Sequence, residues 1–230
     1  MNSLKVEFLG TGTSQGIPVI GSDHPVCLSE DYKDKRLRVS ILIQWEDVNL
    51  VVDCGPDFRQ QLLRTNCSRI DAVLFTHEHS DHTAGLPDMR AMSLINKSII
   101  PAYLSADIHD SMISNYKYIF KGVKDYSPFM TANILEDNFK IDNTEIETFK
   151  HNHGSIDVQT FRINNFAYST DIKSFYENDI DKLKNLDLWI VGLLRYDKHP
   201  SHAGFDQILD YINYLKPKRT LFTHMTALLD

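Results

Sequence analysis

A cluster of metal-ligand side chains directly after an apolar segment constrains this chain more than any other feature. Residues 70–75 are mostly apolar and predict a buried strand. Four residues that follow it, at positions i, i+2, i+4 and i+5, carry imidazole or carboxylate groups: His77, His79, Asp81 and His82. Side chains at this spacing just past a strand end can converge on one point, and neutral imidazole with carboxylate suits zinc, manganese or iron. The segment therefore predicts a metal site.

The other histidines of the chain extend this prediction. A single histidine on an apolar face is usually a packed core residue, but this chain has ten histidines, eight of them in four clusters. One tetrahedral zinc takes four ligands, whereas two ions about 3.5–4 Å apart take six or seven with one bridging oxygen. Enough ligands are available for two ions: His77, His79, Asp81, His82, His153, Asp171 and His224. The number fits a two-metal hydrolase, although counting alone does not choose which residues act together.

Periodicity in the rest of the chain predicts one α/β domain. Alternating or continuous apolar residues predict strands at residues 4–8, 39–45, 48–52, 139–141, 145–149, 160–163, 166–169, 186–194 and 219–222. Apolar residues at helical spacing predict helices at residues 58–64, 107–120 and 205–215, with Asp57 as the N-cap of the first and Pro217 ending the last. Because helices flank two β-rich halves and no linker separates them, we expect one domain over residues 1–230 with helices covering the sheets.

Composition and charge restrict the classes of function. Hydrophobic residues make up 42% of the 230 residues and charged residues 24%, which is ordinary for a soluble globular protein. The formal net charge of -7 and the lack of a clustered basic patch disfavour a nucleic-acid surface. The sequence starts without the pattern of a secretory signal, has no apolar run near the ~20 residues of a membrane helix, and has three cysteines that form no disulfide framework. We therefore expect a cytoplasmic protein with no membrane partner.

The histidine segment and several surrounding segments resemble a known family. Residues 76–82, with Gly85 after them, resemble the H-x-H-x-D-H signature of the metallo-β-lactamase fold. A single histidine, an aspartate after a strand and a final histidine follow in the same order. Residues 12–18, 53–59 and 167–171 resemble the phosphodiesterase branch related to the phosphoribosyl 1,2-cyclic phosphate phosphodiesterases of phosphonate breakdown. The resemblance covers nearly the whole chain and implies an α/β fold of four layers, the αββα sandwich of the metallo-β-lactamase type.

The resemblance also implies a role for each ligand. The family pattern divides them into two sets that share a bridging carboxylate: His77, His79 and His153 for one ion, Asp81, His82 and His224 for the other, and Asp171 as the bridge. His153 is preferred to His151 because it directly precedes Gly154, as the family ligand does, and His151 would then lie beside the site or on the surface. Asp53, at the end of its strand, would accept a hydrogen bond from a ligand imidazole and fix its tautomer, or would only form the turn before Gly55.

Three further residues are connected with the reaction through the resemblance. His202 resembles an additional active-site histidine found shortly before a helix, and its expected role is general acid or stabiliser of the leaving group. His199 competes for this role, and the sequence does not decide between the two. Arg195 lies on the same connection and either contacts a substrate phosphate or forms a surface salt bridge. The predicted catalytic residues are thus His202, Asp81 and Asp171.

One part of the family pattern is missing from this chain. Members of this branch often carry a structural zinc near the N-terminus, bound by closely spaced cysteines and a C-terminal histidine. Here Ser22 and His24 stand where cysteines are expected, and only Cys27 remains. After His224 the chain continues without a further histidine. Because two candidate ligands do not close a tetrahedral site, we expect this structural zinc to be absent.

The predicted function is hydrolysis of a small or cyclic phosphodiester with two divalent ions, through a hydroxide that bridges them. Zinc or manganese is expected, with iron as a further candidate. The alternatives are a thioester hydrolase of the glyoxalase II type, a transfer-RNA 3′-processing endonuclease and a non-catalytic metal-binding module. The net charge of -7 disfavours the endonuclease, and the near-complete ligand set disfavours the binding module. The native metal, the physiological substrate and the oligomeric state, for which we consider a homodimer, are left open by the sequence.

Overall fold

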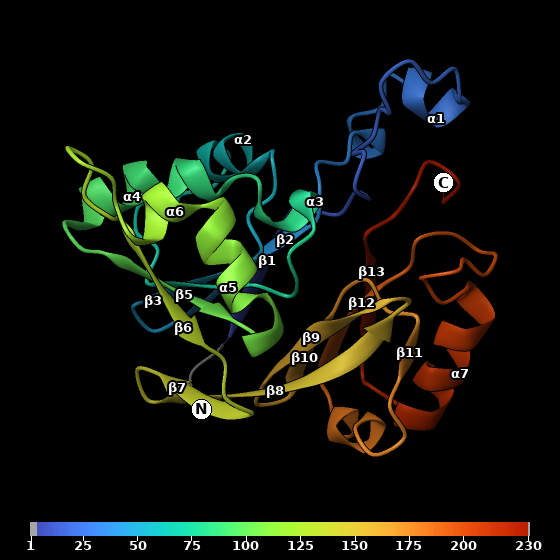
Figure 1. The fold of residues 1–230 in the computed structure, drawn as a ribbon. Coiled ribbons are helices and arrows are strands. Elements are labelled where there is room, and N and C mark those ends of the chain that lie inside the picture. The colour runs from blue at the N-terminus through green and yellow to red at the C-terminus, as the bar shows by residue number, and fades with distance from the viewer. Residues whose placement is uncertain (1–3, 230) are drawn as a thin grey trace. The chain divides into compact units, whose positions relative to one another are not determined.

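The computed structural model describes residues 4–229, and the chain forms two compact units (Figure 1). The first unit takes the chain up to Gly10 and then Leu37–Leu135, and the second takes Thr11–Arg36 and the chain from Glu136 onward. Each unit has its own β-sheet and its own hydrophobic core. The residues of the histidine segment belong to the first unit, and the later candidate ligands belong to the second.

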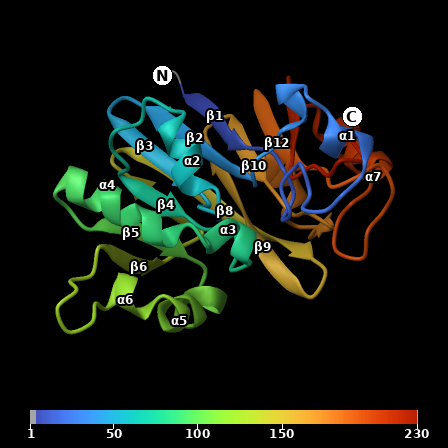
Figure 2. The ribbon, with the colours of Figure 1, turned by 90° about the horizontal axis from the view of Figure 1, so that it is seen from above.

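The sheet of the first unit follows the order of the chain: β1 (Lys5–Gly10), β2 (Ser40–Trp45), β3 (Val48–Val52), β4 (Ala72–Leu74), β5 (Ile100–Leu104) and β6 (Met130–Ile134). The first three strands are antiparallel, and β3 to β6 are parallel to one another. Its helices are α2 (Phe58–Leu63), α3 (Ser80–Thr83), the short 3-10 turn η2 (Leu86–Asp88), α4 (Met89–Asn96), α5 (Ala106–Asn115) and α6 (Lys117–Phe120). Figure 2 shows α4, α5 and α6 beside this sheet, where Met89 and Met112 join Val73 in one apolar cluster.

The sheet of the second unit is mixed. Its strands are β7 (Asn138–Ile141), β8 (Thr144–His153), β9 (Ile156–Ile163), β10 (Phe166–Ser169), β11 (Ser174–Phe175), β12 (Leu188–Gly192) and β13 (Thr220–Thr223). The spatial order is β11-β8-β9-β10-β12-β13, with β7 beside β8. Since β10, β12 and β13 run parallel, Asp171 and His224 follow strands that end at the same edge of the sheet.

Helix α7 (Phe205–Leu215) forms the main helical cover of the second unit. Its buried Ile208 and Leu215 belong to the same apolar cluster as Trp189 of β12. Lys216 ends the helix in a left-handed conformation just before the proline at position 217, as the sequence predicts for this helix end. The shorter segments of this unit are α1 (Pro25–Leu28), η1 (Tyr32–Asp34) and η3 (Ile180–Leu183).

Most predicted elements are confirmed, and two predictions are wrong in part. The hairpins β2–β3 and β9–β10 form as expected. The single helix expected at residues 107–120 is instead two helices, because Tyr116 leaves the helical conformation with φ -117° and ψ 37°. Asp57 does stand at the N-cap position of α2, but its carboxylate accepts hydrogen bonds from the backbone N–H and the guanidinium of Arg38, at 2.8 and 2.9 Å, and caps no helical N–H.

None of the helices within residues 4–229 has both the length and the apolar character that crossing a membrane requires.

Candidate metal centre

The first cluster of candidate ligands lies where β4 ends. The chain leaves β4 and passes Thr76 before His77, and α3 then begins after His79, which stands at its N-cap position. This places Asp81 and His82 within the single turn of α3. His77, Asp81 and His82 are buried, whereas His79 is exposed. A strand end and one helical turn thus aim all four side chains at a common region.

Distances within the first unit show how closely these donor atoms converge. His77 Nε2 lies 2.9 Å from His79 Nδ1, and His82 Nε2 lies 3.2 Å from Asp81 Oδ2. The rings of His77 and His82 are 4.2 Å apart between centroids. Burying several imidazoles and a carboxylate at such short range is costly unless charge and lone pairs are compensated. Three imidazole nitrogens and one carboxylate oxygen form a donor set that fits a divalent transition metal.

Asp53 stabilises this cluster through hydrogen bonds with Thr76 and His82. Its buried carboxylate lies 2.7 Å from His82 Nδ1 through Oδ2, and it accepts hydrogen bonds of 2.8 Å from the backbone N–H and the hydroxyl of Thr76. Burial raises the pKa of Asp53 above its ordinary value, although His82 and the bonds from Thr76 oppose this rise. Because Asp53 Oδ2 accepts a hydrogen bond from Nδ1–H of His82, Nε2 is the ring nitrogen that can coordinate a metal.

Two glycines allow α3 to approach the loop that carries Asp53. A Cβ on Gly55 would lie 2.0 Å from the carbonyl oxygen of Asp81, and a Cβ on Gly85 would lie 2.1 Å from the carbonyl oxygen of Gly55. The backbones are joined by hydrogen bonds of 2.8 Å, from Cys54 N–H to His82 O and from Gly85 N–H to Cys54 O. The position of Asp81 and His82 against Asp53 therefore depends on glycine at both places.

A second cluster lies within the second unit, around Asp171. His224 Nε2 is 3.2 Å from Asp171 Oδ1, and the Nε2 atoms of His153 and His202 are each 3.8 Å from it. All four side chains are buried. They come from the ends of β8, β10 and β13 and from the loop before α7. Donor atoms of His153, Asp171 and His202 lie within 4.8 Å of one another, so this cluster also has the composition of a metal site.

The two histidines near the end of β8 differ in what their nitrogens contact. His153 Nδ1 donates a hydrogen bond of 2.9 Å to the carbonyl oxygen of Ser201. Its other ring nitrogen, Nε2, faces Asp171. Both nitrogens of His151 are engaged, with Thr160 Oγ1 at 2.9 Å and Thr170 O at 2.8 Å. The placement of His151 on the surface, one of two positions considered from the sequence, is wrong: it is fully buried, and burial lowers its pKa to about 4.

His202 lies inside this cluster and His199 lies at its margin. The ring of His202 stacks on His224 at 5.3 Å and meets the edge of His153 at 4.6 Å, while His199 is 5.4 Å away. Burial lowers the pKa of His202 to about 3, although Asp171 opposes this effect. Burial therefore favours the neutral form of the His202 imidazole, which can donate one hydrogen bond and offer one lone pair.

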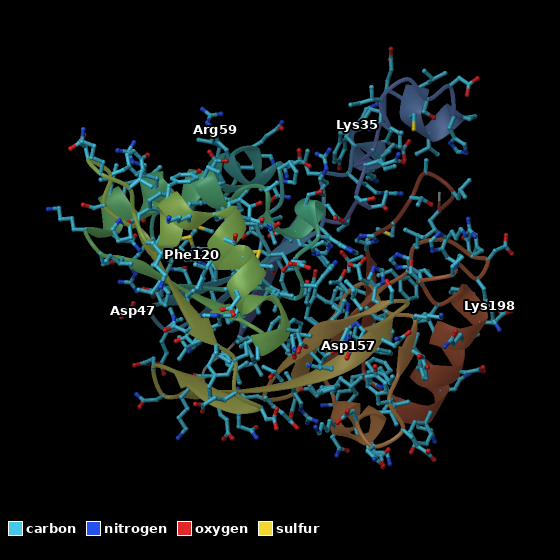
Figure 3. The ribbon with its side chains drawn as sticks, viewed as in Figure 1. Lys35, Asp47, Arg59, Phe120, Asp157 and Lys198 are labelled. Atoms are coloured by element: carbon cyan, nitrogen blue, oxygen red, sulfur yellow. The ribbon has the colours of Figure 1, made fainter. Side chains whose placement is uncertain are left out.

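Arg195 lies on the loop between β12 and α7, close in sequence to His199. One of its guanidinium nitrogens donates a hydrogen bond of 2.9 Å to the carbonyl oxygen of Lys198, whose side chain is labelled in Figure 3. The positive charge of Arg195 contributes, after burial, to lowering the pKa of His199. This loop thus brings cationic side chains to the segment that carries His202.

Three candidate residues share a backbone feature that the sequence does not reveal. Asp53, Asp171 and His224 have φ angles of 60°, 51° and 58°, in the left-handed region that residues other than glycine rarely adopt. Asp53 and His224 directly follow β3 and β13, and Asp171 is the second residue after β10. Strain of this kind costs about 1–3 kcal/mol per residue and is found at functional sites.

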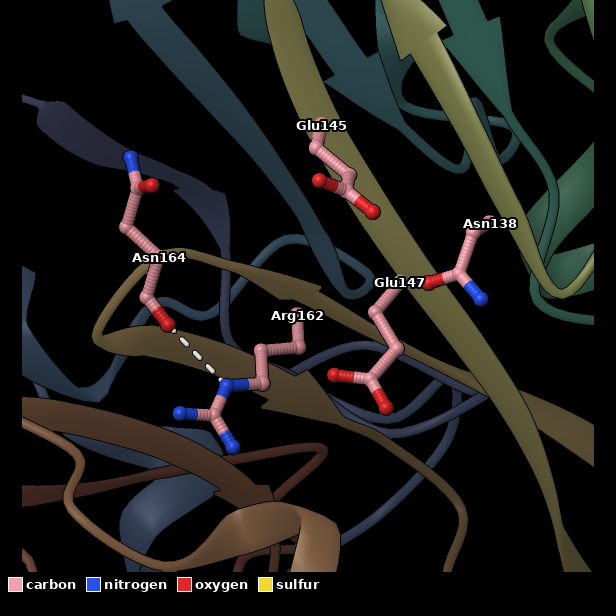
Figure 4. A pocket seen from close by; sticks show the side chains of 5 residues that line it. All are labelled: Asn138, Glu145, Glu147, Arg162 and Asn164. Atoms are coloured by element: carbon pink, nitrogen blue, oxygen red, sulfur yellow. Dashed lines mark hydrogen bonds between the residues drawn. The ribbon is translucent and has the colours of Figure 1, made fainter.

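A polar pocket of the second unit is separate from this cluster. It has a volume of about 420 Å³ and is lined by polar side chains of β7, β8, β9 and the β9–β10 turn (Figure 4): Asn138, Glu145, Glu147, Arg162 and Asn164. Glu147 and His153 are six residues apart on β8, which corresponds to about 20 Å along an extended strand. The pocket therefore lies at the opposite end of β8 from the candidate ligands.

The two candidate ligands for a structural zinc in the N-terminal segment, His24 and Cys27, have other partners in this structure. His24 Nδ1 accepts a hydrogen bond from the N–H of Val26 and caps α1. Cys27 is buried in a small apolar cluster with Ile17 and Ala227. The absence of a structural zinc here stays a prediction.

Comparison with known proteins gives the family. The model of the beta-lactamase superfamily domain matches residues 48–225. An octanoyltransferase of Porphyromonas gingivalis is 34% identical over 224 residues, which are 95% of this chain and 45% of that protein. A ribonuclease Z of Bradyrhizobium sp. is 29% identical over 94 residues, 40% of this chain and 27% of that protein. This chain thus spans less than half the length of these curated relatives.

Solved structures agree with this family. A diphosphatase from the PhnP family has a TM-score of 0.91 and 31% identity, with 99% of this chain and 88% of that chain covered. Zinc-bound PqqB from Methylobacterium extorquens has a TM-score of 0.78 over 98% of this chain and 90% of that chain, and at 17% identity it shows the fold alone. The predicted α/β fold of the metallo-β-lactamase type is confirmed, and the chain belongs to the beta-lactamase superfamily domain family.

Proposed function

We propose that this chain is a metal-dependent phosphodiesterase acting on a small or cyclic phosphodiester, with one catalytic domain over residues 1–230. The observation that carries the proposal is the convergence of buried imidazoles and a carboxylate in each unit, around His82 and around Asp171. The likeness to a PhnP-family diphosphatase, at 31% identity over nearly the whole chain, supports a phosphorus ester as the substrate.

The proposed centre binds two divalent ions, zinc or manganese, and the ligands follow the family order. One ion would be held by His77, His79 and His153, the other by Asp81, His82 and His224, with Asp171 shared. The Nε2 lone pairs of His82 and His153 support this assignment, since Asp53 and the carbonyl of Ser201 occupy their Nδ1 atoms. When bound, such ions supply positive charge for the transition state and lower the pKa of a nearby water.

The side chains beside the ligands then have distinct tasks. His202, neutral and next to Asp171, donates its N–H to the leaving oxygen of the ester. Arg195 and the loop before α7 orient the negatively charged phosphate. In this account His199 assists from the margin, because its ring lies 5.4 Å from that of His202, whereas His202 Nε2 itself lies 3.8 Å from Asp171 Oδ1.

The proposal is tested by turnover with matched variants. Zinc- or manganese-loaded protein should hydrolyse bis(4-nitrophenyl) phosphate or a cyclic nucleotide, and Asp171→Ala should lose at least about 100-fold in kcat/KM. Asp157→Ala is the control, since Asp157 is an exposed carboxylate of the same unit that bonds Tyr176 (Figure 3). Equal activity of Asp171→Ala and wild type would reject the proposal.

One observation favours a second candidate, hydrolysis of an acyl thioester. The relative that covers 95% of this chain is an octanoyltransferase, although only 45% of that protein is matched. The same assay therefore includes an octanoyl thioester, and a precursor transfer RNA because ribonuclease Z relatives match part of the chain. Preference for the thioester by more than about tenfold in kcat/KM would replace the phosphodiesterase proposal.

A further inference from the structure

A chain of buried polar side chains crosses the sheet of the second unit and ends beside Asp171. Trp189 Nε1 donates a hydrogen bond of 3.2 Å to Ser169 Oγ, which lies 3.0 Å from Thr160 Oγ1. Thr160 Oγ1 lies 2.9 Å from His151 Nδ1, and His151 Nε2 lies 2.8 Å from the carbonyl oxygen of Thr170. All five residues are fully buried.

The carbonyl at one end of this chain determines which nitrogen of His151 donates. A carbonyl oxygen only accepts, so His151 carries a proton on Nε2 and donates a hydrogen bond to Thr170 O. At the other end, the indole of Trp189 and the hydroxyl of Thr160 both donate to Ser169 Oγ. Thr160 Oγ1 also lies 2.9 Å from His151 Nδ1, so both ring nitrogens of His151 have a buried polar partner that holds the ring in place.

Three contacts constrain the peptide bond between Thr170 and Asp171, where this series of buried side chains ends. Asp171 is in the left-handed region, and its Oδ2 accepts a hydrogen bond of 2.8 Å from the Thr170 hydroxyl. Gly192 of β12 lies so close that a Cβ there would come within 2.8 Å of Asp171 N. His151 holds the Thr170 carbonyl on the third side. Since φ of Asp171 turns about the bond next to this peptide, the orientation of the Thr170–Asp171 peptide sets where the carboxylate points.

We propose that His151 is a positioning residue, which orients the carboxylate of Asp171 through the Thr170 carbonyl. The proposal rests on the proposed function, in which Asp171 is the shared ligand of two ions. A residue that only filled the core would need neither a donor at Nε2 nor a partner next to Asp171. Residues that orient ligands from behind typically change metal affinity or activity by about 10–100-fold when they are replaced.

The test compares two amides that differ in reach. His151→Gln places an amide N–H close to the position of Nε2, where it can still donate to Thr170 O, whereas the shorter His151→Asn places it near Nδ1. The zinc affinity of each variant is measured by competition with a chromophoric chelator, and kcat and KM are measured with bis(4-nitrophenyl) phosphate. In His151→Asn, the affinity for the more weakly bound of the two zinc ions should fall about 10–100-fold, and kcat should fall by a larger factor than KM rises. His151→Gln should stay within about threefold of wild type.

Folding is checked on the metal-free proteins by urea unfolding. Equal zinc affinity and equal kcat for the two variants would overturn the proposal. It would also be overturned if the losses of zinc affinity and kcat were proportional to the loss of free energy of unfolding in the metal-free variants. Wild-type protein that binds two zinc ions but turns over no ester would overturn the proposed function alone, because the zinc affinities still report on His151. Wild-type protein that takes up no zinc would overturn both.

Discussion

At the scale of single residues, the strained backbone at Asp53, Asp171 and His224 allows a binding role of these side chains to be distinguished from a role in stability. These residues have φ angles between 51° and 60°, and each lies within two residues of the end of a strand. Local hydrogen bonds fix them: Asp53 N–H, for example, donates to Leu74 O at 2.9 Å. A fold chosen for stability alone would place glycine or asparagine at such positions. We therefore propose that these side chains serve the metal centre and not the stability of the fold.

Asp171→Gly tests this separation. Because glycine adopts a positive φ without strain, we expect the metal-free variant to keep its free energy of unfolding or to gain about 1 kcal/mol, while activity is lost. Urea unfolding at neutral pH in the presence of a chelator measures the effect. Asp157→Gly is the control on β9, where glycine should cost about 0.5–1 kcal/mol. A loss for Asp171→Gly as large as for the control would contradict the account.

His151 also gives the metal-free protein a defined pH dependence. Burial lowers its pKa from 6.5 to about 4, so between these values the unfolded chain binds a proton that the folded protein does not. Its contribution to stability is complete above pH 6.5 and is lost as the pH falls toward 4. Between pH 7 and pH 5 this loss should amount to about 2 kcal/mol. The comparison is with His151→Gln, which does not titrate, and equal losses in both proteins over this range would exclude the effect.

At the scale of elements, the close approach of α3 to the loop after β3 builds the first cluster. Hydrogen bonds of 2.8 Å join Cys54 to His82 and to Gly85. They hold the turn that carries Asp81 and His82 against Asp53. This geometry depends on backbone proximity, so it is sensitive to a single methyl group.

Gly85→Ala measures that sensitivity. The new Cβ would lie 2.1 Å from Gly55 O and 2.6 Å from the Cβ of Phe58, so the backbone must shift. We expect a loss of more than about 3 kcal/mol in the free energy of unfolding, with weaker metal binding in any folded fraction. Ala84→Ser, at the exposed neighbouring position, should change stability by less than about 0.5 kcal/mol. Similar unfolding midpoints for the two variants would show that this contact is not tight.

Elements whose signal is local could be predicted from the sequence, and those that depend on tertiary contacts could not. The ligand segment after β4 and helix α7 follow from spacing and periodicity alone. The expected cap by Asp57 fails because Arg38, far away in the chain, competes for the carboxylate. Strands β5 and β6 were not predicted, since five-residue strands such as β5, which contains Pro101, carry little periodicity.

The candidate site shows the same division. The likeness of residues 76–82 to a family signature leads to the ligand types, and each cluster holds them at short range within its unit. The buried partners of His151 are spread over β9, β10 and the loop after it. No spacing in the sequence predicts these contacts of His151. The left-handed conformations at Asp53, Asp171 and His224 likewise become visible only in the structure.

At the scale of the whole molecule, each of the two units holds one cluster of candidate metal ligands. The net charge of -7 favours a small substrate over a long nucleic acid, since extended phosphate backbones need clustered basic residues. Membership of the beta-lactamase superfamily domain family agrees with metal-dependent hydrolysis. We propose a phosphorus ester over an acyl ester as the substrate because the chain is 31% identical to a PhnP-family diphosphatase.

The most direct test is the number of metal ions per chain. Purified wild-type protein is loaded with zinc or manganese, freed of excess metal and analysed for its elements, and its turnover of bis(4-nitrophenyl) phosphate is measured on the same sample. We expect about two ions per chain and turnover that rises with the second ion, because Asp171 is proposed as the ligand shared by both ions. Fewer than about one ion per chain under metal-replete conditions would contradict it.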